Sequence, residues 1–251
     1  MENATNIPVP AISVKGLFMS FGENKAVLKG LDLVVEEGES IVLLGKSGSG
    51  KSIAIKCIVG LMQPDKGEIQ VFGKNIVAMD EQSLNEVRLS IGFLFQSSAL
   101  YDSMSVRENL TFPLVRHEPG LSKIEQDERI MEALESVGLT DAIEKMPSEL
   151  SGGMRKRIGL ARTLILKPTI MLYDEPTTGL DTITSREISE LIVSIQKKRK
   201  TSSIIITHDL ACARRTGNKL AVLFEGEIIM LGTYQELENS ADERVQSFFI
   251  E

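Results

Sequence analysis

Short apolar runs recur along the chain, each closed by a glycine or a polar residue, and this pattern is typical of strands buried in a sheet. The runs are SIVLLG (40–45), GEIQVFG (67–73), IGFLFQ (91–96), TIMLYDE (169–175), SSIIITHD (202–209) and LAVLFEGEIIMLG (220–232). Their separation by helical patterns predicts an α/β fold, in which a mainly parallel sheet is covered by helices.

Helical spacing follows the first run at KSIAIKCIVGLM (51–62) and returns at about 182–198. Residues 105–165 differ, because helical patterns there follow one another without a strand. These patterns are VRENLTFPL, KIEQDERIMEALESVGL and GGMRKRIGLARTLIL. The block therefore reads as a helical subdomain inserted between two strands of the sheet.

Composition narrows the class of protein. The 251 residues are 42% hydrophobic and 25% charged, which is ordinary for a globular chain. The net charge of −7 gives no support for nucleic-acid binding, which usually leaves a basic footprint. Cys57 and Cys212 fit neither a disulfide framework nor a metal site and read as reduced thiols. Residues 1–10 lack the basic start and apolar core of a secretory signal and are expected to form a loose arm.

A glycine-rich segment joins the first strand to the first helix. GKSGSGKS fits the phosphate-binding P-loop pattern G-x-x-x-x-G-K-[ST], and it consists of Gly45, Lys46, Ser47, Gly48, Ser49, Gly50, Lys51 and Ser52. The glycines let backbone N–H groups converge on a phosphate, and the helix N-terminus adds positive potential. Lys51 can reach the β- and γ-phosphates, and the Ser52 hydroxyl can bind Mg²⁺. The alternative, a flexible surface loop, does not explain the strand-loop-helix context.

Two carboxylates stand at the end of the strand IMLYDE. Asp174 is placed to hold Mg²⁺ through water, and Glu175 to orient or deprotonate an attacking water. A strand-end turn or a helix cap would explain an isolated Asp-Glu pair. Its combination with a P-loop favours nucleotide hydrolysis.

A third segment, ELSGGMRKR (149–157), sets Ser151, Gly152 and Gly153 before a helix. Free N–H groups at that helix N-terminus can bind phosphate, although a serine N-cap with two loop glycines is the simpler interpretation. His208 follows an apolar run, where its imidazole can reach a γ-phosphate or serve as a structural cap. The order of these segments along the chain decides between the alternatives.

That order resembles the ATP-binding cassette (ABC) ATPases over about residues 12–238. GKSGSGKS resembles the family's Walker A motif, IMLYDEP its Walker B motif and LSGGM its signature. Further matches are TTGLD with Asp181 to the D-loop, Gln96 to the Q-loop, His208 to the switch histidine and Phe21 to the aromatic residue under adenine.

The resemblance implies a P-loop NTPase (RecA-like) cassette over 11–238, with an N-terminal antiparallel β region, a helical subdomain at about 97–165 and a short tail at 239–251. It implies ATP as substrate and Mg²⁺ held by Ser52, Gln96 and Asp174. Glu175, His208 and Gln96 are the expected catalytic residues. Phe21 is expected to stack on adenine, with a core position as the alternative.

In this family the signature of one subunit closes over ATP bound to the other. Ser151, Gly152 and Gly153 are therefore expected to contact the ATP of a partner subunit. One chain carries one complete set of motifs, so a homodimer is the simplest assembly.

Two stretches resemble the ATPase subunits of MCE (Mla-type) phospholipid transporters, namely 92–117 and 145–157, with Met154 where many ABC proteins carry Gln. This resemblance implies a membrane permease of the MlaE type, a periplasmic MCE-domain protein and, in some complexes, a small STAS-domain protein. It places the chain at the cytoplasmic face of the inner membrane. A groove near residues 96–113 would accept a coupling helix of the permease. The alternatives are an ABC transporter for another cargo, such as an amino acid or a lipoprotein, and a soluble ABC ATPase without a transport role.

Overall fold

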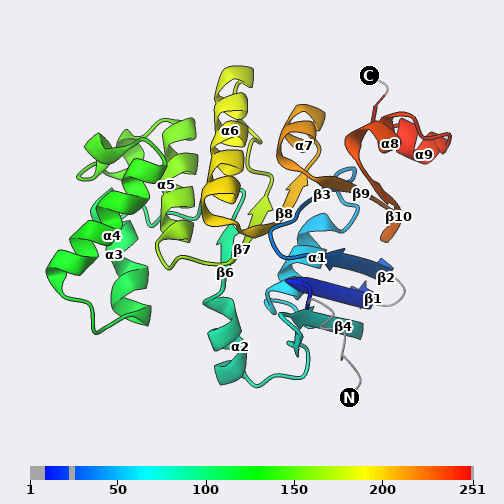
Figure 1. The fold of residues 1–251 in the computed structure, drawn as a ribbon, viewed down its shortest axis with the longest axis horizontal. Helices are drawn as coiled ribbons and strands as arrows, with labels where there is room; N and C mark the ends of the chain where they lie inside the picture. Colours follow the sequence, from blue (N-terminus) through cyan, green and yellow to red (C-terminus); the bar gives the residue numbers. More distant parts are fainter. Residues whose placement is uncertain (1–8, 23–25, 250–251) are drawn as a thin grey trace, which may run out of the picture.

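The computed structural model describes residues 9–22 and 26–249 (Figure 1). The strands are β1 (Ile12–Ser20), β2 (Ala26–Val35), β3 (Ser40–Leu44), β4 (Lys66–Val71), β5 (Lys74–Asn75), β6 (Ile91–Leu94), β7 (Ile170–Asp174), β8 (Ser202–Thr207), β9 (Lys219–Phe224) and β10 (Glu227–Gly232). The helices are α1 (Lys51–Ile58), α2 (Glu81–Arg88), α3 (Val106–His117), α4 (Lys123–Ser136), η1 (Thr140–Ala142), η2 (Pro147–Glu149), α5 (Gly152–Leu164), α6 (Thr182–Arg199), α7 (Leu210–Thr216), α8 (Tyr234–Glu238) and α9 (Glu243–Gln246).

The larger sheet has the strand order β10-β9-β3-β8-β7-β6. All neighbouring strands in it are parallel except β10, which runs antiparallel to β9. In the register Leu44 lies beside Thr207, and Asp174 lies beside Ile206. The loops that follow β3, β7 and β8 therefore leave the sheet at the same edge, which brings the P-loop, Glu175 and His208 together.

The predicted N-terminal antiparallel region is present as the sheet β2-β1-β4-β5. Alternate residues of the central strands divide the core between the two faces of the larger sheet, as the strand period of two requires. Leu43 packs with residues of β1, β2 and α1, whereas its neighbour Val42 packs with α5, α6 and α7. Each apolar central strand is thus buried on both faces.

The helical block expected at about 97–165 contains α3, α4, η1, η2 and α5, at the left of Figure 1. Capping boxes define where its helices begin: Ser105 pairs with Glu108 at α3, and Ser122 pairs with Glu125 at α4. The tail beyond residue 238 contains α9, and Phe249 packs edge-to-face on Tyr234 of α8. Most of the expected loose arm, residues 1–8, lies outside the described residues.

The secondary structure adds to or differs from the sequence prediction at several points. The helix expected over 51–62 ends at Ile58, because Gly60 has a φ of 68° and turns the chain away. The stretch 220–232 is a hairpin of β9 and β10, since Glu225 and Gly226 both have positive φ. Helices α2 and α7 were not predicted, although Asp80 and Asp209 cap them.

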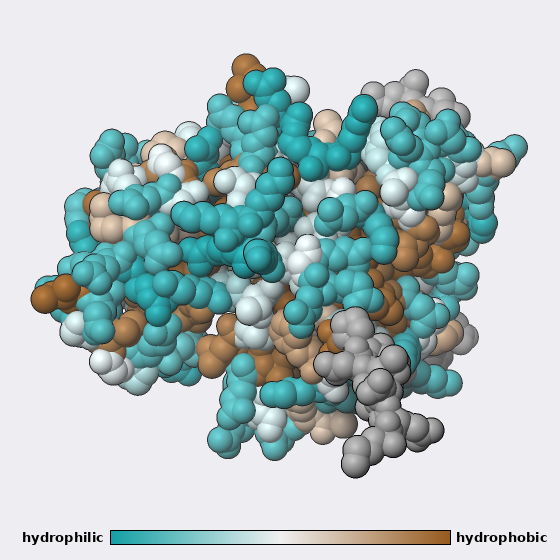
Figure 2. All heavy atoms as spheres, viewed as in Figure 1, coloured by the Kyte–Doolittle hydropathy of each residue, from teal (hydrophilic) through white to brown (hydrophobic). Residues whose placement is uncertain are grey.

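Hydrophilic side chains cover most of the face drawn in Figure 2, with hydrophobic residues in smaller separate patches. Within residues 9–22 and 26–249, no helix combines the length and apolar character needed to cross a membrane. Cys57 and Cys212 are both buried and free, in agreement with the prediction of reduced thiols.

Candidate active site

The P-loop forms a nest at the C-terminal end of β3. Gly48 and Gly50 have φ values of 81° and 103°, which L side chains rarely adopt. A Cβ at Gly50 would also lie 2.9 Å from Cδ2 of Leu28. The loop therefore requires glycine at this position for its conformation and for its packing.

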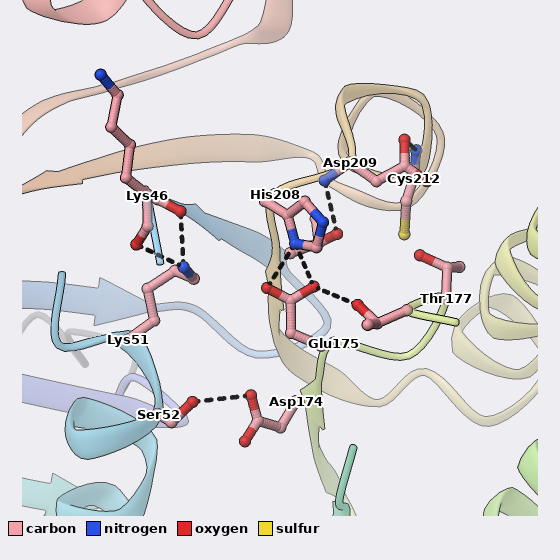
Figure 3. Close-up of polar contacts among 12 residues, drawn as sticks. Lys46, Lys51, Ser52, Asp174, Glu175, Thr177, His208, Asp209 and Cys212 are labelled. Carbon is pink, nitrogen blue, oxygen red and sulfur yellow. Dashed lines mark hydrogen bonds and ion pairs between the residues drawn. The ribbon is translucent and has the colours of Figure 1, made fainter. Parts of the chain in front are cut away.

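Lys51 opens α1 and turns its side chain back into the loop. Its ammonium donates to the carbonyl oxygens of Gly45, at 2.6 Å, and of Lys46, at 3.1 Å (Figure 3). Burial lowers the pKa of Lys51, whereas the carboxylates of Glu175 and Asp174 raise it. The cation is thus held by loop carbonyls close to both carboxylates.

Ser52 and Asp174 face each other across α1 and β7. The Ser52 hydroxyl donates to Oδ1 of Asp174 at 3.0 Å (Figure 3). Burial raises the pKa of Asp174, and the Ser52 hydrogen bond opposes that change. A hydroxyl and a carboxylate are oxygen ligands of the kind Mg²⁺ prefers. Among the described residues there is no cluster of three or more His, Cys, Asp or Glu placed to hold a metal ion.

Glu175 follows Asp174 in a left-handed conformation with a φ of 50°, which is uncommon for a residue other than glycine and often marks a functional site. Nδ1 of His208 lies 3.0 Å from Oε1 and 2.9 Å from Oε2 of Glu175. The Thr178 hydroxyl donates to Oε2 at 3.0 Å. The carboxylate is thereby oriented by two side chains from two different loops.

Lys51, Ser52, Glu175, Thr178 and His208 line one cavity of about 460 Å³, whereas Asp174 is not among its lining residues. Its walls are formed by Val27, Lys46, Ser47, Gly48, Gly50, Lys51, Ser52, Ile53, Gln96, Glu175, Thr178 and His208. The geometry brings together the P-loop, the Q-loop glutamine, the Glu175 carboxylate and the His208 imidazole. Sequence reasoning missed three of these wall residues, namely Val27, Ile53 and Thr178. The threonine could have been suspected because it is the second residue of the matched TTGLD segment, whereas Val27 and Ile53 carry no such signal.

Phe21 does not line this cavity; its side chain is 43% exposed. The signature residues also lie elsewhere. Ser151 caps α5, and its hydroxyl accepts from the N–H of Met154 at 3.3 Å. A Cβ at Gly153 would lie 2.6 Å from Cγ2 of Thr184, so the signature packs tightly against the start of α6.

Asp181 lies beside the signature, at the N-cap of α6. Its carboxylate accepts from the N–H groups of Ile183 and Thr184 at 3.0 Å and from the Thr184 hydroxyl at 2.6 Å. These hydrogen bonds lower the pKa of Asp181. The signature and D-loop are thus adjacent to each other and separate from the chain's own cavity.

A P-loop at the end of a parallel strand, with two carboxylates at the end of a neighbouring strand, defines the class of the P-loop nucleotide hydrolases. The chain matches the family model described as "ABC transporter" over residues 28–178, and it belongs to that family. It is therefore an ATPase whose ATP hydrolysis is coupled to transport. Cassettes of this family dimerise and work with membrane permeases.

Two relatives with different names cover most of the chain. The chain is 40% identical over 240 residues to the probable ribonucleotide transport ATP-binding protein mkl of Mycobacterium leprae, covering 95% of this chain and 68% of that protein. It is 37% identical over 265 residues to the Arabidopsis thaliana chloroplastic protein TRIGALACTOSYLDIACYLGLYCEROL 3, covering 99% and 75%.

The fold is confirmed by a solved structure, the dimeric post-hydrolysis state of the ATP-binding cassette MJ0796 bound to ADP and Pi. Its TM-score is 0.81 at 29% identity, over 88% of this chain and 98% of that chain. The predicted α/β fold of a P-loop ABC cassette is therefore confirmed.

Proposed function

We propose that this chain powers phospholipid transport across a bacterial envelope, as the ATPase subunit beside a separate MlaE-type permease and an MCE-domain protein. The stretches 92–117 and 145–157 support this branch through their resemblance to MCE-transporter ATPases. The name of the Arabidopsis relative is that of a galactolipid, which agrees with a lipid cargo. The proposed location is peripheral, at the cytoplasmic face of the inner membrane.

The single observation that carries the ATPase part is the joint placement of Lys51, Glu175 and His208 around one cavity. In the proposed mechanism, Lys51 and the P-loop N–H groups bind the β- and γ-phosphates. Glu175 takes a proton from the attacking water, and its carboxylate is oriented for this by Thr178 and His208.

The oxygen donors of Ser52 and Asp174 fit Mg²⁺, with Gln96 lining the same cavity. When bound, the ion would neutralise charge on the phosphates. Phe21 is proposed to stack on adenine, at the end of β1 and beyond the cavity walls. Both assignments rest on position in the fold and on the resemblance of the motifs.

The assembly proposed is a homodimer with two composite sites. Ser151 is exposed on the surface, and Gly152 beside it is exposed as well. Neither residue faces the chain's own cavity, so both are free to meet the ATP of a partner subunit. Fixed N–H dipoles at the start of α5 would stabilise negative charge developing on the γ-phosphate.

A surface suited to a permease lies on the helical block. Tyr101 and Phe112 are 44% and 43% exposed and pack edge-to-face, with ring centroids 5.2 Å apart. Phe112 also lines a cavity of about 990 Å³ between α3 and α4. Exposed aromatic side chains beside a groove suit the binding of a partner helix. A coupling helix of the permease is the proposed occupant, and a small STAS-domain protein is a further proposed partner.

An alternative cargo remains the second candidate. The chain is 38% identical over 224 residues to the glycine betaine/proline betaine ATP-binding protein ProV of Escherichia coli, covering 88% of this chain and 56% of that protein. Such a name supports the alternative of an ABC transporter for another cargo, for which an amino acid or a lipoprotein was the expectation. A soluble ABC ATPase without a permease is the third candidate.

The test is a pull-down of tagged Glu175→Gln from detergent-solubilised membranes with ATP and Mg²⁺, followed by mass spectrometry of proteins and lipids. The control carries Lys51→Met as well, which removes the phosphate-binding ammonium. ATP-dependent recovery of a permease, an MCE-domain protein and phospholipid is expected. A different permease without an MCE protein would move the chain to another transporter branch. Soluble partners alone would contradict a role in transport.

A further inference from the structure

Lys156 is a lysine of α5 whose side chain is buried, with 6% of its surface exposed. Its ammonium donates to two main-chain carbonyls, those of Gln96 and Glu175. The second contact is 3.3 Å long. These two acceptors belong to the Q-loop and to the residue after β7, 79 positions apart in the chain. One side chain of the signature helix therefore joins two segments that line the nucleotide cavity.

The same face of α5 packs closely on the Q-loop. A Cβ at Gly159 would lie 2.8 Å from Cβ of Ser98 and 3.1 Å from its carbonyl oxygen. Lys156 and Gly159 are three residues apart and therefore share one face of the helix. Thr163 continues this face and lies against Gly92 of β6. The contact of Lys156 is thus one end of a continuous seam between α5 and residues 92–98.

The Q-loop at this seam has an unusual backbone. Ser98 and Ala99 have φ values of 63° and 47°, in a region that costs energy for residues other than glycine. Glu175 is in the same left-handed region. Both carbonyls bound by Lys156 therefore belong to segments whose backbone is held away from its preferred conformation, and such conformations persist only where neighbouring groups fix them.

We propose that Lys156 is a positioning residue for ATP hydrolysis, whose ammonium fixes the main chain of Gln96 and Glu175 relative to each other and to the signature helix. This inference rests on the proposed roles of those two residues. Lys156 does not line the cavity and does not reach the reacting atoms. It acts by holding the Glu175 carboxylate and the Gln96 amide at their places on the cavity wall.

A merely structural role is the competing explanation. Burial lowers the pKa of Lys156, while the carboxylates of Asp174 and Glu175 raise it. A buried ammonium is an expensive way to fill space, because desolvation disfavours the charged form. The position of this ammonium, hydrogen-bonded to two carbonyls of the site, is explained if one cation must hold those two segments together.

The test compares Lys156→Met, Lys156→Gln and Lys156→Arg in the full chain, with ATPase kinetics, affinity for a fluorescent ATP analogue and thermal melting. Lys156→Met keeps an unbranched side chain only one atom shorter and removes the N–H donors. We expect it to lower kcat by roughly tenfold or more, because small displacements of catalytic groups are costly. KM and analogue affinity should stay within about twofold, and Lys156→Arg should restore most of the loss. Lys167→Met is the matched control, because Lys167 is exposed just beyond the other end of α5 and pairs with Glu132; it should keep wild-type kcat.

A folded Lys156→Met variant with wild-type kcat would overturn the proposal. So would a loss of analogue affinity equal to the loss of kcat, because the residue would then support binding. If Lys156→Met does not fold, Lys156→Gln is measured instead; it has a shorter side chain and a neutral amide donor, so it tests whether the charge and the reach of the ammonium are needed, and an unchanged kcat there counts against the proposal. Glu175→Gln is measured in parallel. Wild-type turnover in that variant would refute the role of Glu175. The kcat values of the Lys156 variants test the role of Lys156 independently of that result.

Discussion

Nδ1 of His208 lies within 3.0 Å of both carboxylate oxygens of Glu175, although the two residues follow different strands and are 33 positions apart. The His208 side chain is 63% exposed, whereas that of Glu175 is 12% exposed. The imidazole therefore covers the carboxylate from the solvent side. The parallel register of β7 and β8 produces this contact, because the two strands end at the same edge of the sheet.

The two residues are expected to act as one unit. Glu175→Gln should lower kcat by about 10²–10⁴, the usual contribution of a general base, and leave ATP bound in a closed dimer. His208→Ala should lower kcat when introduced into the wild type. It should lower kcat much less when introduced into Glu175→Gln, because the effects of residues in contact are not additive. ATPase rates of both single variants and the double variant test this, with dimer mass measured by light scattering in ATP.

Additive losses in this cycle would show that His208 does not act through Glu175. Wild-type turnover of Glu175→Gln would mean that another group takes the proton. Thermal melting of each variant is the control for misfolding.

From the contact between Ser52 and Asp174 we expect the Mg²⁺ requirement of the ATPase activity to depend on the Ser52 hydroxyl. Ser52→Ala removes a hydroxyl ligand, and we expect the Mg²⁺ concentration for half-maximal ATPase to rise by roughly tenfold, as for loss of a group that supports a metal site. Ser203→Ala is the matched control, because that hydroxyl is fully buried on β8 and remote from the cavity. An unchanged Mg²⁺ titration in a folded Ser52→Ala variant would contradict the assignment.

Tyr173 predicts an effect on stability. Its side chain is fully buried, and its hydroxyl has no hydrogen-bond partner among the described residues. Burial raises the pKa of this phenol. Tyr173→Phe removes an unsatisfied polar group and keeps the ring, so we expect the free energy of unfolding to stay unchanged or to rise by about 1 kcal/mol. Urea unfolding without nucleotide measures the change, and a loss of about 1 kcal/mol or more would show that the hydroxyl is satisfied.

Much of the site could be predicted from the sequence because its chemistry lies in contiguous segments. The P-loop reads as one pattern, and apolar runs place Asp174 and His208 at strand ends. The role of Lys156 could not be assigned in this way, since its partners are set by the packing of α5 on two other segments. Thr178 lies in a matched segment, but its contact with Glu175 depends on the turn after β7. The bounds of α1 were missed for a similar reason, because an apolar pattern continues past Gly60 while the backbone turns there.

Cys57 predicts a pH-dependent contribution to stability. It lies on α1 behind the P-loop, where burial, with a smaller effect from Asp65, raises the pKa of its thiol from 9.0 to about 11. Because the pKa is raised in the folded state, the contribution of the protonated thiol to the free energy of unfolding is fully present below pH 9.0. It is lost as the pH rises through about 11. Over that window the free energy of unfolding should fall by up to about 1.4 kcal/mol per pH unit from this group.

The measurement is urea unfolding of the wild type and of Cys57→Ala at several pH values from 8 to 11. Subtracting the unfolding free energy of the variant from that of the wild type at each pH cancels the contributions of all other groups. The pH dependence of this difference reports the thiol alone. Reaction of the native protein with a thiol reagent at pH 8 should be slow, because the thiolate is the reactive form and both cysteines are buried. A constant difference in stability across the window, together with fast labelling of Cys57 in a Cys212→Ala variant, would show that the thiol behind the P-loop is accessible to water.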